Sequence, residues 1–510
     1  MTMARSSASG VCRPRVAVTG ATGFVGRAFI EAMADRYELV GLSRAPATAR
    51  KPFPHQWRRC DLFSLLDVER TLAGCRDAIY LVHSMMPSAR LTQASFADLD
   101  LILADNFGRG AARAGVKHIV YVGGLLPEGQ ALSRHLDSRR EVEQALGAYG
   151  VRVTSLRAGL VVGAEGSSFR ILRRLVERLP VMLCPGWTRT RTQPIAIEDL
   201  VALIGGAIDH PEHQGKIHDV GGPDVLTYQE MIADVAALLG KNPRMVPVPA
   251  FSPSLSRLWV SLVTGASRSL VSPLVQSLRH EMVAGDRALQ RALEIPGRPW
   301  REAARDALSS PSSETSASAL CASVPVPTVT RERRRMLRRR RTVRSVQRLP
   351  RPEAASAEQI AHEYLQWLPA FLRHLLVVDV EGEEQHVARF RFRLMRRPLL
   401  VLELARERSN SQRALFYVTG GMLARQQGRT GRLEFRTVPD GRYVLAAIHE
   451  FTPALPWYIY LVSQALVHLL VMRCFGAHLR RVDARALPAA PRALPEAGRD
   501  EVAHSEPASA

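Results

Sequence analysis

The chain has 510 residues, a formal net charge of +21 and a hydrophobic content of 46%. This length exceeds what one ordinary hydrophobic core holds, so we expect two or three domains. The six cysteines have no paired spacing, which argues against a zinc site or a disulfide framework and indicates a reducing compartment.

The charge and the N-terminus bear on partners and location. The N-terminal residues contain no apolar core before the first expected strand, so no secretory signal is expected and a cytoplasmic location is predicted. Residues 331–348 hold ten arginines and one glutamate. Such a block can bind nucleic acid or an anionic membrane surface. No nucleic-acid-reading module surrounds it, and residues 309–330 before it have the composition of a linker, so we expect no specific nucleic-acid partner.

Residues 16–26 read VAVTGATGFVG, a short apolar strand that leads into three glycines and then into a helical pattern. Gly20 permits a tight turn, Gly23 lets the backbone approach a pyrophosphate, and Gly26 lets the helix pack close to the sheet. The helix N-terminus offers free N–H groups to phosphates. The motif therefore predicts a dinucleotide site. The residues expected to hold the cofactor here are Gly20, Ala21, Thr22, Gly23, Phe24, Val25 and Gly26.

The motif Thr-Gly-Ala-Thr-Gly-Phe-Val-Gly resembles that of the extended and atypical short-chain dehydrogenase/reductases, including their NmrA-like branches. The resemblance implies an α/β fold with a doubly wound parallel (Rossmann) sheet over residues 14–308 and a substrate-side insertion at 167–198. The alternation of apolar strand runs with helical patterns also predicts such a sheet.

Further cofactor contacts follow from the ends of the expected strands. Arg44 follows the strand at 38–42, where the adenosine ribose would lie. An arginine at this point accommodates a 2′-phosphate, which favours NADP(H) over NAD(H). The resemblance implies that Asp61 and Leu62 touch the adenine. It also places the backbone of His83 and Ser84, at the end of the apolar run 77–83, beside the cofactor ribose.

The catalytic positions depart from the family pattern. Family members that reduce carbonyls carry a Ser or Thr at the end of the fifth strand and a Tyr-x-x-x-Lys on the next helix. Here the strand ends in Gly123-Gly124, and by spacing His135 and Arg139 occupy the Tyr and Lys positions.

Two interpretations stay open. In one, His135 is the general acid, and Arg139 holds the ribose and lowers the pKa of His135 through its charge. In the other, both are ordinary polar residues of a helix beside the cofactor, and the protein binds NADP(H) without turnover.

Residues 343–482 are predicted to form a second, α+β domain after a linker at 309–342. The order of a strand, a helix, an antiparallel sheet and a long terminal helix resembles the helix-grip fold, whose members often hold apolar ligands. Residues 1–13 and 483–510 are expected to be flexible or disordered. The expected elements are strands at 343–349, 385–394, 399–404, 414–418, 432–438 and 443–451, with a helix at 357–375 and a closing helix.

Residues 451–472 contain no Asp, Glu, Lys or Arg and approach the length that spans a bilayer of about 30 Å. Two prolines near the start and the polar residues Ser463, Gln464 and His468 favour a buried or interface-lying helix over a span. This segment and the block 331–348 are the two places where membrane contact is expected.

The function predicted from these features is NADPH-dependent reduction or oxidation of a small, apolar carbonyl or alcohol. A cofactor-sensing protein without turnover is one alternative. A membrane-associated, lipid-handling protein with a regulatory Rossmann half is the other.

Overall fold

The computed structural model describes residues 13–44, 55–83, 91–127, 129, 132–248, 277–310, 342–381, 387–425, 430–438 and 441–482. The chain divides into two compact units, each considered by itself below. Unit 1 comprises residues 1–88 and 95–338, and unit 2 comprises residues 89–94 and 339–510. Ser84, most of the block 331–348 and the predicted flexible tail at 483–510 lie outside the described residues.

A parallel sheet forms the centre of unit 1, with strands in the order β12-β7-β6-β4-β1-β2-β3. The predicted doubly wound parallel sheet is thereby confirmed. The order reverses between β1 and β4, and in such sheets ligands bind at the carboxyl ends of the strands beside this reversal. The strands are β1 (Arg15–Thr19), β2 (Glu38–Ser43), β3 (Gln56–Arg59), β4 (Asp77–Tyr80), β6 (His118–Gly124), β7 (Arg152–Ala158) and β12 (Ile217–Val220).

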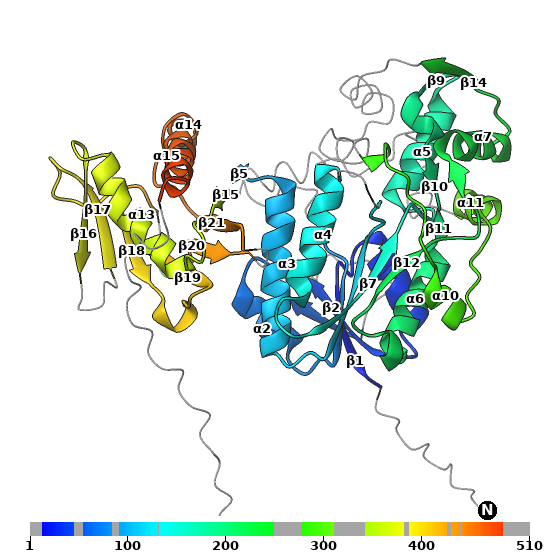
Figure 1. Cartoon of the computed structure of the whole chain (residues 1–510), viewed down its shortest axis with the longest axis horizontal. Coiled ribbons are helices and arrows are strands. Elements are labelled where there is room, and N and C mark those ends of the chain that lie inside the picture. Colours follow the sequence, from blue (N-terminus) through cyan, green and yellow to red (C-terminus); the bar gives the residue numbers. More distant parts are fainter. Residues whose placement is uncertain are drawn as a thin grey trace, which may run out of the picture. The chain divides into compact units, whose positions relative to one another are not determined.

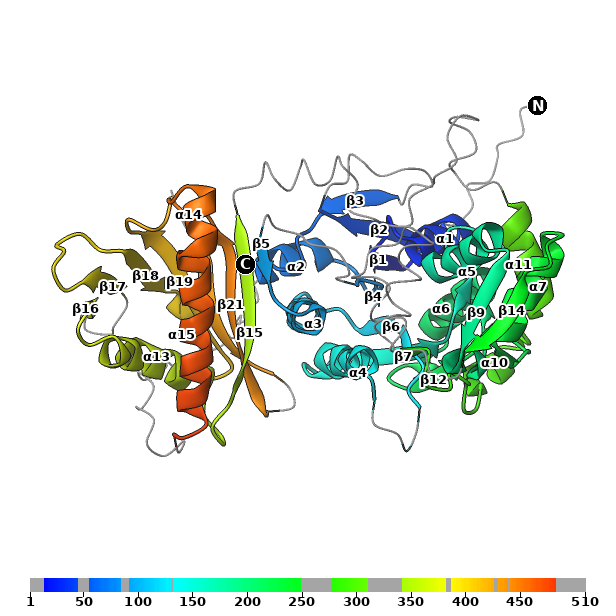
Figure 2. The same ribbon diagram turned by 90° about the horizontal axis from the view of Figure 1, so that it is seen from above.

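Helices cover both faces of this sheet (Figures 1 and 2). α1 and α6 pack together on one face, and α2, α3 and α4 pack side by side on the other. The apolar strands β1 and β4 are buried between the two layers, as expected for a parallel sheet that is covered on both sides. The helices are α1 (Phe24–Met33), α2 (Leu65–Leu72), α3 (Phe96–Arg113), α4 (Arg134–Gly147) and α6 (Ile197–Asp209).

Most of the remaining elements of unit 1 form a smaller lobe around their own core. Phe169 and Leu172 of α5 pack there with Met231 of α7 and Trp300 of α11. Two short helices pack with the parallel sheet instead: η3 (Pro211–His213) beside α6 and α10 (Ala288–Ala292) beside β12. The lobe consists of β8 (Val161–Val162), α5 (Ser167–Arg178), β9 (Val181–Pro185), η2 (Gly186–Arg189), β10 (Arg191–Thr192), β11 (Ile195–Ala196), β13 (Leu226–Thr227), α7 (Tyr228–Leu238), β14 (Arg244–Val248) and α11 (Trp300–Ser309).

Unit 2 is an antiparallel sheet with a terminal helix, as predicted. Its strands run in the order β16-β17-β18-β19-β20-β21-β15-β5. Tyr364 of α13, Phe435 of β20 and Phe475 of α15 meet in its core. The elements are β15 (Val343–Pro350), α13 (Ala357–Phe371), β16 (Leu376–Glu381), β17 (Val387–Phe392), β18 (Leu400–Leu404), η4 (Arg406–Arg408), β19 (Arg413–Gly420), β20 (Arg432–Thr437), β21 (Tyr443–Phe451), α14 (Trp457–Val462) and α15 (Gln464–Leu479).

Three local predictions differ from the structure. The helix expected to reach residue 375 ends at Phe371, two residues after Pro369, and β16 begins at Leu376 after a four-residue turn. The sequence analysis missed β16 because its apolar run continues the apolar pattern of the helix. The strand expected at 77–83 ends at Tyr80.

Strand β5 (Leu91–Gln93) is the third difference. It lies in sequence between β4 and α3 of unit 1, inside the range predicted for the first domain. It nevertheless pairs in parallel with β15 and belongs to unit 2. Three residues are too few to show a period in the sequence, so this exchange was not predicted.

Candidate functional site

The glycine turn after β1 has the geometry that a nucleotide-binding loop needs. Gly20 adopts a left-handed φ of +64°, and a β-carbon there would lie 3.1 Å from the Leu81 carbonyl oxygen. The Gly23 N–H donates to the Gly20 carbonyl at 2.7 Å and closes the turn. At Gly26 a β-carbon would come within 2.4 Å of that same carbonyl, so this glycine lets α1 start directly over the turn. Gly26 thus allows a close approach between α1 and the turn, whereas the expected close approach was between the helix and the sheet.

The loop fits the pyrophosphate of a dinucleotide. Thr22 and Gly23 are exposed. A β-carbon at Gly23 would meet only the Gly20 carbonyl, at 3.0 Å, which leaves its other side open to a ligand. α1 has no side-chain cap and no acidic residue in its first turn. Its first N–H groups therefore lack a competing anion, and a phosphate can accept from them. Ala21 is buried and Phe24 and Val25 are half-buried, so only the backbone around Thr22 and Gly23 opens to solvent.

The other predicted cofactor residues lie at the ends of β2, β3 and β4. Arg44 is exposed directly after β2, and no carboxylate of the described residues pairs with it. The Asp61 carboxylate accepts from the Phe63 N–H at 3.2 Å within its own loop. The Leu62 carbonyl accepts from the Asn106 side-chain amide at 2.8 Å, which anchors this loop to α3. Ser84 lies outside the described residues.

Two of the predicted catalytic and cofactor side chains meet a buried acid. His83 Nδ1 lies 3.0 Å from Asp100 Oδ2 and is also in contact with the Arg139 guanidinium. Arg139 Nη1 lies 4.0 Å from the same carboxylate oxygen. Since the guanidinium only donates, His83 Nδ1 either donates to Asp100 or accepts from Arg139, and it cannot do both at once. The Arg139 side chain is therefore engaged with His83 and Asp100 inside the protein, where it is 5% exposed.

His135 joins this group through its ring. The imidazoles of His83 and His135 are stacked, with centroids 5.9 Å apart. His135 and Arg139 are one turn apart on α4 and so project from the same face of the helix. α4 begins there because the Ser133 hydroxyl accepts from the Leu136 N–H and caps it.

Burial sets the protonation of these groups. It lowers the pKa of His135, while the Asp100 carboxylate acts in the opposite direction. The sequence analysis predicted this direction, but it assigned the cause to the Arg139 charge, and the main cause is burial. Burial also lowers the pKa of Arg139, to about 9, so the guanidinium stays charged at neutral pH. His135 is then a neutral imidazole at pH 7 and can accept a proton.

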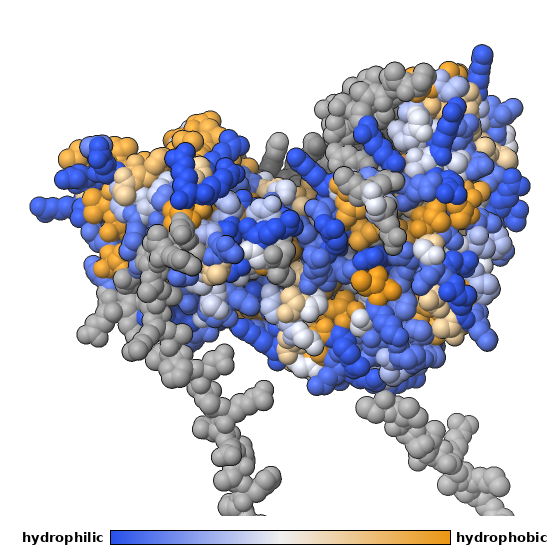
Figure 3. All heavy atoms as spheres, in the orientation of Figure 1, coloured by the Kyte–Doolittle hydropathy of each residue, from blue (hydrophilic) through white to orange (hydrophobic). Residues whose placement is uncertain are grey.

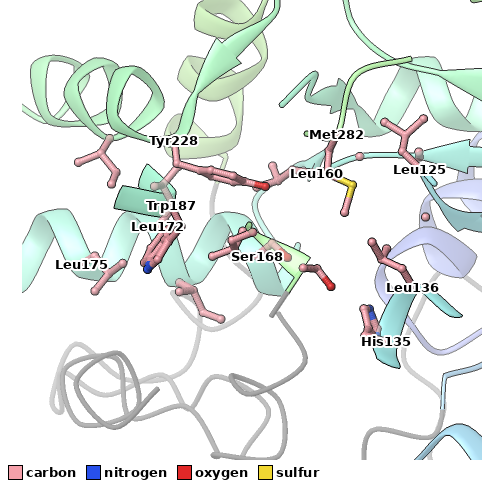
Figure 4. Close-up of a pocket in the computed structure, with 17 residues that line it drawn as sticks. Leu125, His135, Leu136, Leu160, Ser168, Leu172, Leu175, Trp187, Tyr228 and Met282 are labelled. Carbon is pink, nitrogen blue, oxygen red and sulfur yellow. The ribbon is translucent and has the colours of Figure 1, made fainter. Parts of the chain in front are cut away.

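A largely apolar cavity of about 210 Å³ opens beside His135, in front of the carboxyl end of β6 (Figure 4). Its wall comes from α4, α5, α7, η2 and the exits of β6 and β7. The Tyr228 hydroxyl points toward Leu160 across the cavity (Figure 4). The cavity residues shown in Figure 4 include Leu125, His135, Leu136, Leu160, Ser168, Leu172, Leu175, Trp187, Tyr228 and Met282.

Sequence reasoning missed two polar residues of this region. Asp100 lies in the second turn of α3 and is 4% exposed, and an acid within an apolar helical stretch was the available signal. Tyr228 is the first residue of α7, which a capping box of Thr227 and Glu230 starts. The Thr-x-x-Glu spacing marks that helix start in the sequence. The sequence alone does not show that Tyr228 and His135 line the same cavity.

Comparison with known proteins agrees with the fold and the glycine turn. Residues 16–131 match the NAD dependent epimerase/dehydratase family. The matched stretch contains the glycine turn, Arg44 and His83, and it ends just before α4.

Curated relatives are similar to a longer part of the chain. Auxiliary protein GraX of Staphylococcus aureus is 31% identical over 182 residues, which are 34% of this chain and 55% of that protein. Subunit 9 of the NADH dehydrogenase [ubiquinone] 1 alpha subcomplex, mitochondrial, of Arabidopsis thaliana is 25% identical over 48% of this chain and 62% of that subunit. The chain thus spans 55% and 62% of the length of these two relatives. A ceramide reductase of Caulobacter vibrioides is 26% identical over 46% of this chain and 73% of that enzyme.

Solved structures resemble the same part of the chain. A nucleoside-diphosphate-sugar epimerase from Staphylococcus aureus aligns with a TM-score of 0.47 and 14% identity, over 57% of this chain and 99% of that one. An NADPH-dependent quinone oxidoreductase from Escherichia coli, complexed with NADPH, aligns with a TM-score of 0.46 and 20% identity, over 57% of this chain and 98% of that one.

Proposed function

We propose that unit 1 is an NADPH-dependent oxidoreductase that reduces or oxidises a small, apolar carbonyl or alcohol, with His135 as the proton-transfer group. One observation carries this proposal: His135 lines an apolar cavity at the carboxyl end of β6, on the edge of the sheet that also bears the glycine turn. A proton carrier and an apolar cavity beside a cofactor loop are what carbonyl redox chemistry requires.

The cofactor side of the proposal rests on the glycine turn and on Arg44. The backbone at Gly23 and the first turn of α1 would hold the pyrophosphate, and the exposed Arg44 would bind the 2′-phosphate. When bound, NADPH supplies the hydride that a carbonyl carbon accepts. The chain itself supplies the position of the substrate and the proton.

His135 handles the proton at the substrate oxygen. In the oxidative direction the neutral imidazole accepts the proton of the alcohol. Burial lowers the pKa of His135 and so keeps the imidazole in this neutral form. In the reductive direction the imidazolium gives its proton to the carbonyl oxygen and returns to the neutral form. Since the imidazolium is scarce at neutral pH, reduction should be faster in mildly acidic buffer.

The cavity walls define the substrate class. Leucines, Trp187 and Met282 offer apolar contact, and about 210 Å³ suits a small molecule rather than a nucleotide sugar. Tyr228 adds one hydroxyl. Burial raises the pKa of Tyr228 to about 12, so this hydroxyl stays protonated and can donate to a carbonyl oxygen. These features favour a compact apolar aldehyde, ketone or quinone.

The test is NADPH consumption with a panel of such carbonyl compounds, with NADPH affinity measured separately. On a working substrate His135→Ala should lower kcat by about 10²–10⁴-fold and leave the NADPH Kd nearly unchanged. His210→Ala, on the exposed end of α6, serves as the matched control. Wild-type turnover in His135→Ala contradicts the assignment of His135. Tight NADPH binding without turnover on any compound favours the cofactor-sensing alternative.

A further inference from the structure

Unit 2 carries an exposed apolar face that the redox chemistry of unit 1 does not use. Leu394 is 99% exposed, Val462 73% and Tyr458 71%, values that are unusual for large apolar side chains. The name apolar face is used below for nine exposed apolar residues of unit 2. They are Phe392, Leu394, Met422, Tyr458, Ile459, Val462, Leu466, Val467 and Leu470.

Backbone hydrogen bonds bring the segments of the apolar face together. The Met422 N–H donates to the Pro398 carbonyl at 3.0 Å, which joins the turn after β17 to the segment after β19. The Ala454 N–H donates to the Leu423 carbonyl at 3.0 Å and joins that segment to the entry of α14. The three segments therefore lie side by side. Figure 3 shows apolar side chains gathered over α14 and over the neighbouring end of the sheet.

The helical part of the face is a stripe that continues across the break between α14 and α15 at Ser463. Tyr458 and Val462 share one side of α14, Leu466 and Leu470 share one side of α15, and all four side chains are more than half exposed. Met472, Phe475 and Leu479 of α15 are buried in the core of unit 2. The helix is thus apolar on its solvent side as well as on its core side. A helix of a soluble protein ordinarily has charged residues on the solvent side.

Positive charge borders the apolar face. Residues 451–482 contain no Asp or Glu. The exposed Arg473 lies within α15, and the exposed Arg480 and Arg481 follow its last residue. The turn after β17 places Arg393, Arg396 and Arg397 around Leu394, and all three arginines are exposed. An apolar surface bordered by arginines matches the acyl chains and the anionic headgroups of a bilayer surface.

The attachment of α15 to the sheet favours lying on a membrane over crossing it. By length and composition the stretch Trp457–Leu479 could cross a bilayer, although core helices of soluble proteins pass the same test. His468 Nε2, however, lies 3.1 Å from the Ser345 hydroxyl of β15. The Gln93 side-chain amide donates to the Ala465 carbonyl at 3.1 Å. A crossing helix would have to leave these partners and expose Phe475, whereas surface contact requires neither.

We propose that unit 2 docks through the apolar face on the surface of an anionic phospholipid bilayer. Leu394, Met422 and the side chains of the α14–α15 stripe enter the acyl boundary, and the bordering arginines bind the headgroup phosphates. Such binding would hold unit 1 next to a membrane, where apolar carbonyl compounds concentrate.

The experiment is flotation of the full-length protein with vesicles of phosphatidylcholine alone or mixed with phosphatidylglycerol. We expect the protein to float with the mixed vesicles and to be released by salt. The double variant Val462→Asp/Leu466→Asp should partition at least about tenfold more weakly, because two apolar anchors are lost. Its control is Leu66→Asp/Val225→Asp, which adds the same two negative charges at 44%- and 42%-exposed positions of unit 1. Circular dichroism checks that both variants are folded.

The charged border is tested separately. Arg393→Glu/Arg396→Glu/Arg397→Glu should remove the preference for phosphatidylglycerol, since each basic residue near an anionic surface strengthens binding about fivefold. Failure of the wild type to float with the mixed vesicles overturns the proposal. So does unchanged flotation of the double variant. A lipid-free dimer in light scattering that the double variant loses would assign the face to a second copy of the chain instead.

Discussion

The imidazole rings of His83 and His135 lie stacked, with centroids 5.9 Å apart and planes inclined by 19°. One ring follows β4 and the other begins α4, so the contact bridges two segments that meet at the carboxyl edge of the sheet. Behind the stack, Asp100 and Arg139 set the electrostatic surroundings of the proposed proton carrier. Mutations of these neighbours should therefore move the pH dependence of catalysis.

The pH profile of the wild type follows from the lowered pKa of His135. Oxidation needs the neutral imidazole, so log kcat/KM for an alcohol should be flat at neutral pH and fall only below about pH 6.5. Reduction needs the imidazolium, so its rate should increase as the pH decreases through the same region. Steady-state kinetics in both directions measure this. A limb above the ordinary histidine value would contradict the assignment.

Asp100→Asn should shift the acidic limb of the pH profile, which reports the pKa of His135, to lower pH. The carboxylate favours the imidazolium of His135, so its removal leaves burial as the dominant influence and lowers the pKa further. Asp98→Asn, on the same helix but bonded to the exposed Ser95, is the control and should leave the limb in place. A limb that moves to higher pH in Asp100→Asn would show that Asp100 acts otherwise.

Arg44→Ala should reduce the preference for NADPH over NADH. A charge-assisted hydrogen bond contributes roughly 1.5–3 kcal/mol, so the ratio of the two affinities should fall by roughly 10- to 150-fold. Calorimetric titration of both cofactors gives the ratio. Arg113→Ala, an exposed arginine at the end of α3, provides the matched loss of charge. An unchanged ratio in Arg44→Ala would remove the basis for the NADPH preference.

Gly23→Val should abolish NADPH binding while the protein stays folded. Gly23 has φ −82°, a backbone conformation open to every residue, so the valine adds a tight contact with the Gly20 carbonyl at 3.0 Å but no left-handed backbone strain. The rest of its side chain occupies the space meant for the pyrophosphate. Gly20→Ala is the informative contrast: its φ of +64° should cost about 1–2 kcal/mol of stability. Thermal unfolding and calorimetry separate the two effects. Wild-type affinity in folded Gly23→Val would exclude this loop as the phosphate site.

A buried ion network should control the stability of unit 2. Arg413 donates twice to Glu434, at 2.9 and 2.7 Å, and Arg436 donates to the same carboxylate at 3.2 Å. Glu434 and Arg436 are each 1% exposed. Burial alone would raise the pKa of Glu434, but the Arg436 and Arg413 guanidiniums outweigh it and hold that pKa well below its ordinary value. The carboxylate therefore stabilises the fold above the unfolded pKa near 4.3, and this contribution is lost as the pH falls.

Glu434→Leu removes the acid and leaves two buried guanidiniums. The free energy of unfolding of unit 2 should fall by about 3–5 kcal/mol, while NADPH binding by unit 1 persists. Denaturant titration followed by circular dichroism measures the loss. Glu407→Leu, at an exposed position of η4, is the control and should change stability by less than about 0.5 kcal/mol. A Glu434→Leu protein as stable as the wild type would show that the network is not needed.

Much of the fold could be predicted because its signals are local. The strand, the three glycines and the helix after them specify one another within eleven residues, since a left-handed φ at Gly20 and a free helix N-terminus depend only on nearby backbone. The strands of unit 2 were also found within a few residues of their ends, apart from β16 and β5. β16 was not predicted because its apolar run continues the pattern of the preceding helix. β5 was not predicted because its three residues are too few to show an alternating pattern.

The candidate site depended on contacts that sequence spacing cannot specify. Spacing placed His135 and Arg139 one helical turn apart, and the family resemblance implied, in one of two interpretations, that Arg139 holds the cofactor ribose. In the folded protein the guanidinium lies against His83 and Asp100, whose positions depend on the pairing of β4 with β6 and on the packing of α3 beside α4. The local sequence thus determined which backbone could bind a dinucleotide. Only the tertiary structure decided which charges surround His135, because that depends on side chains from separate elements converging in one buried place.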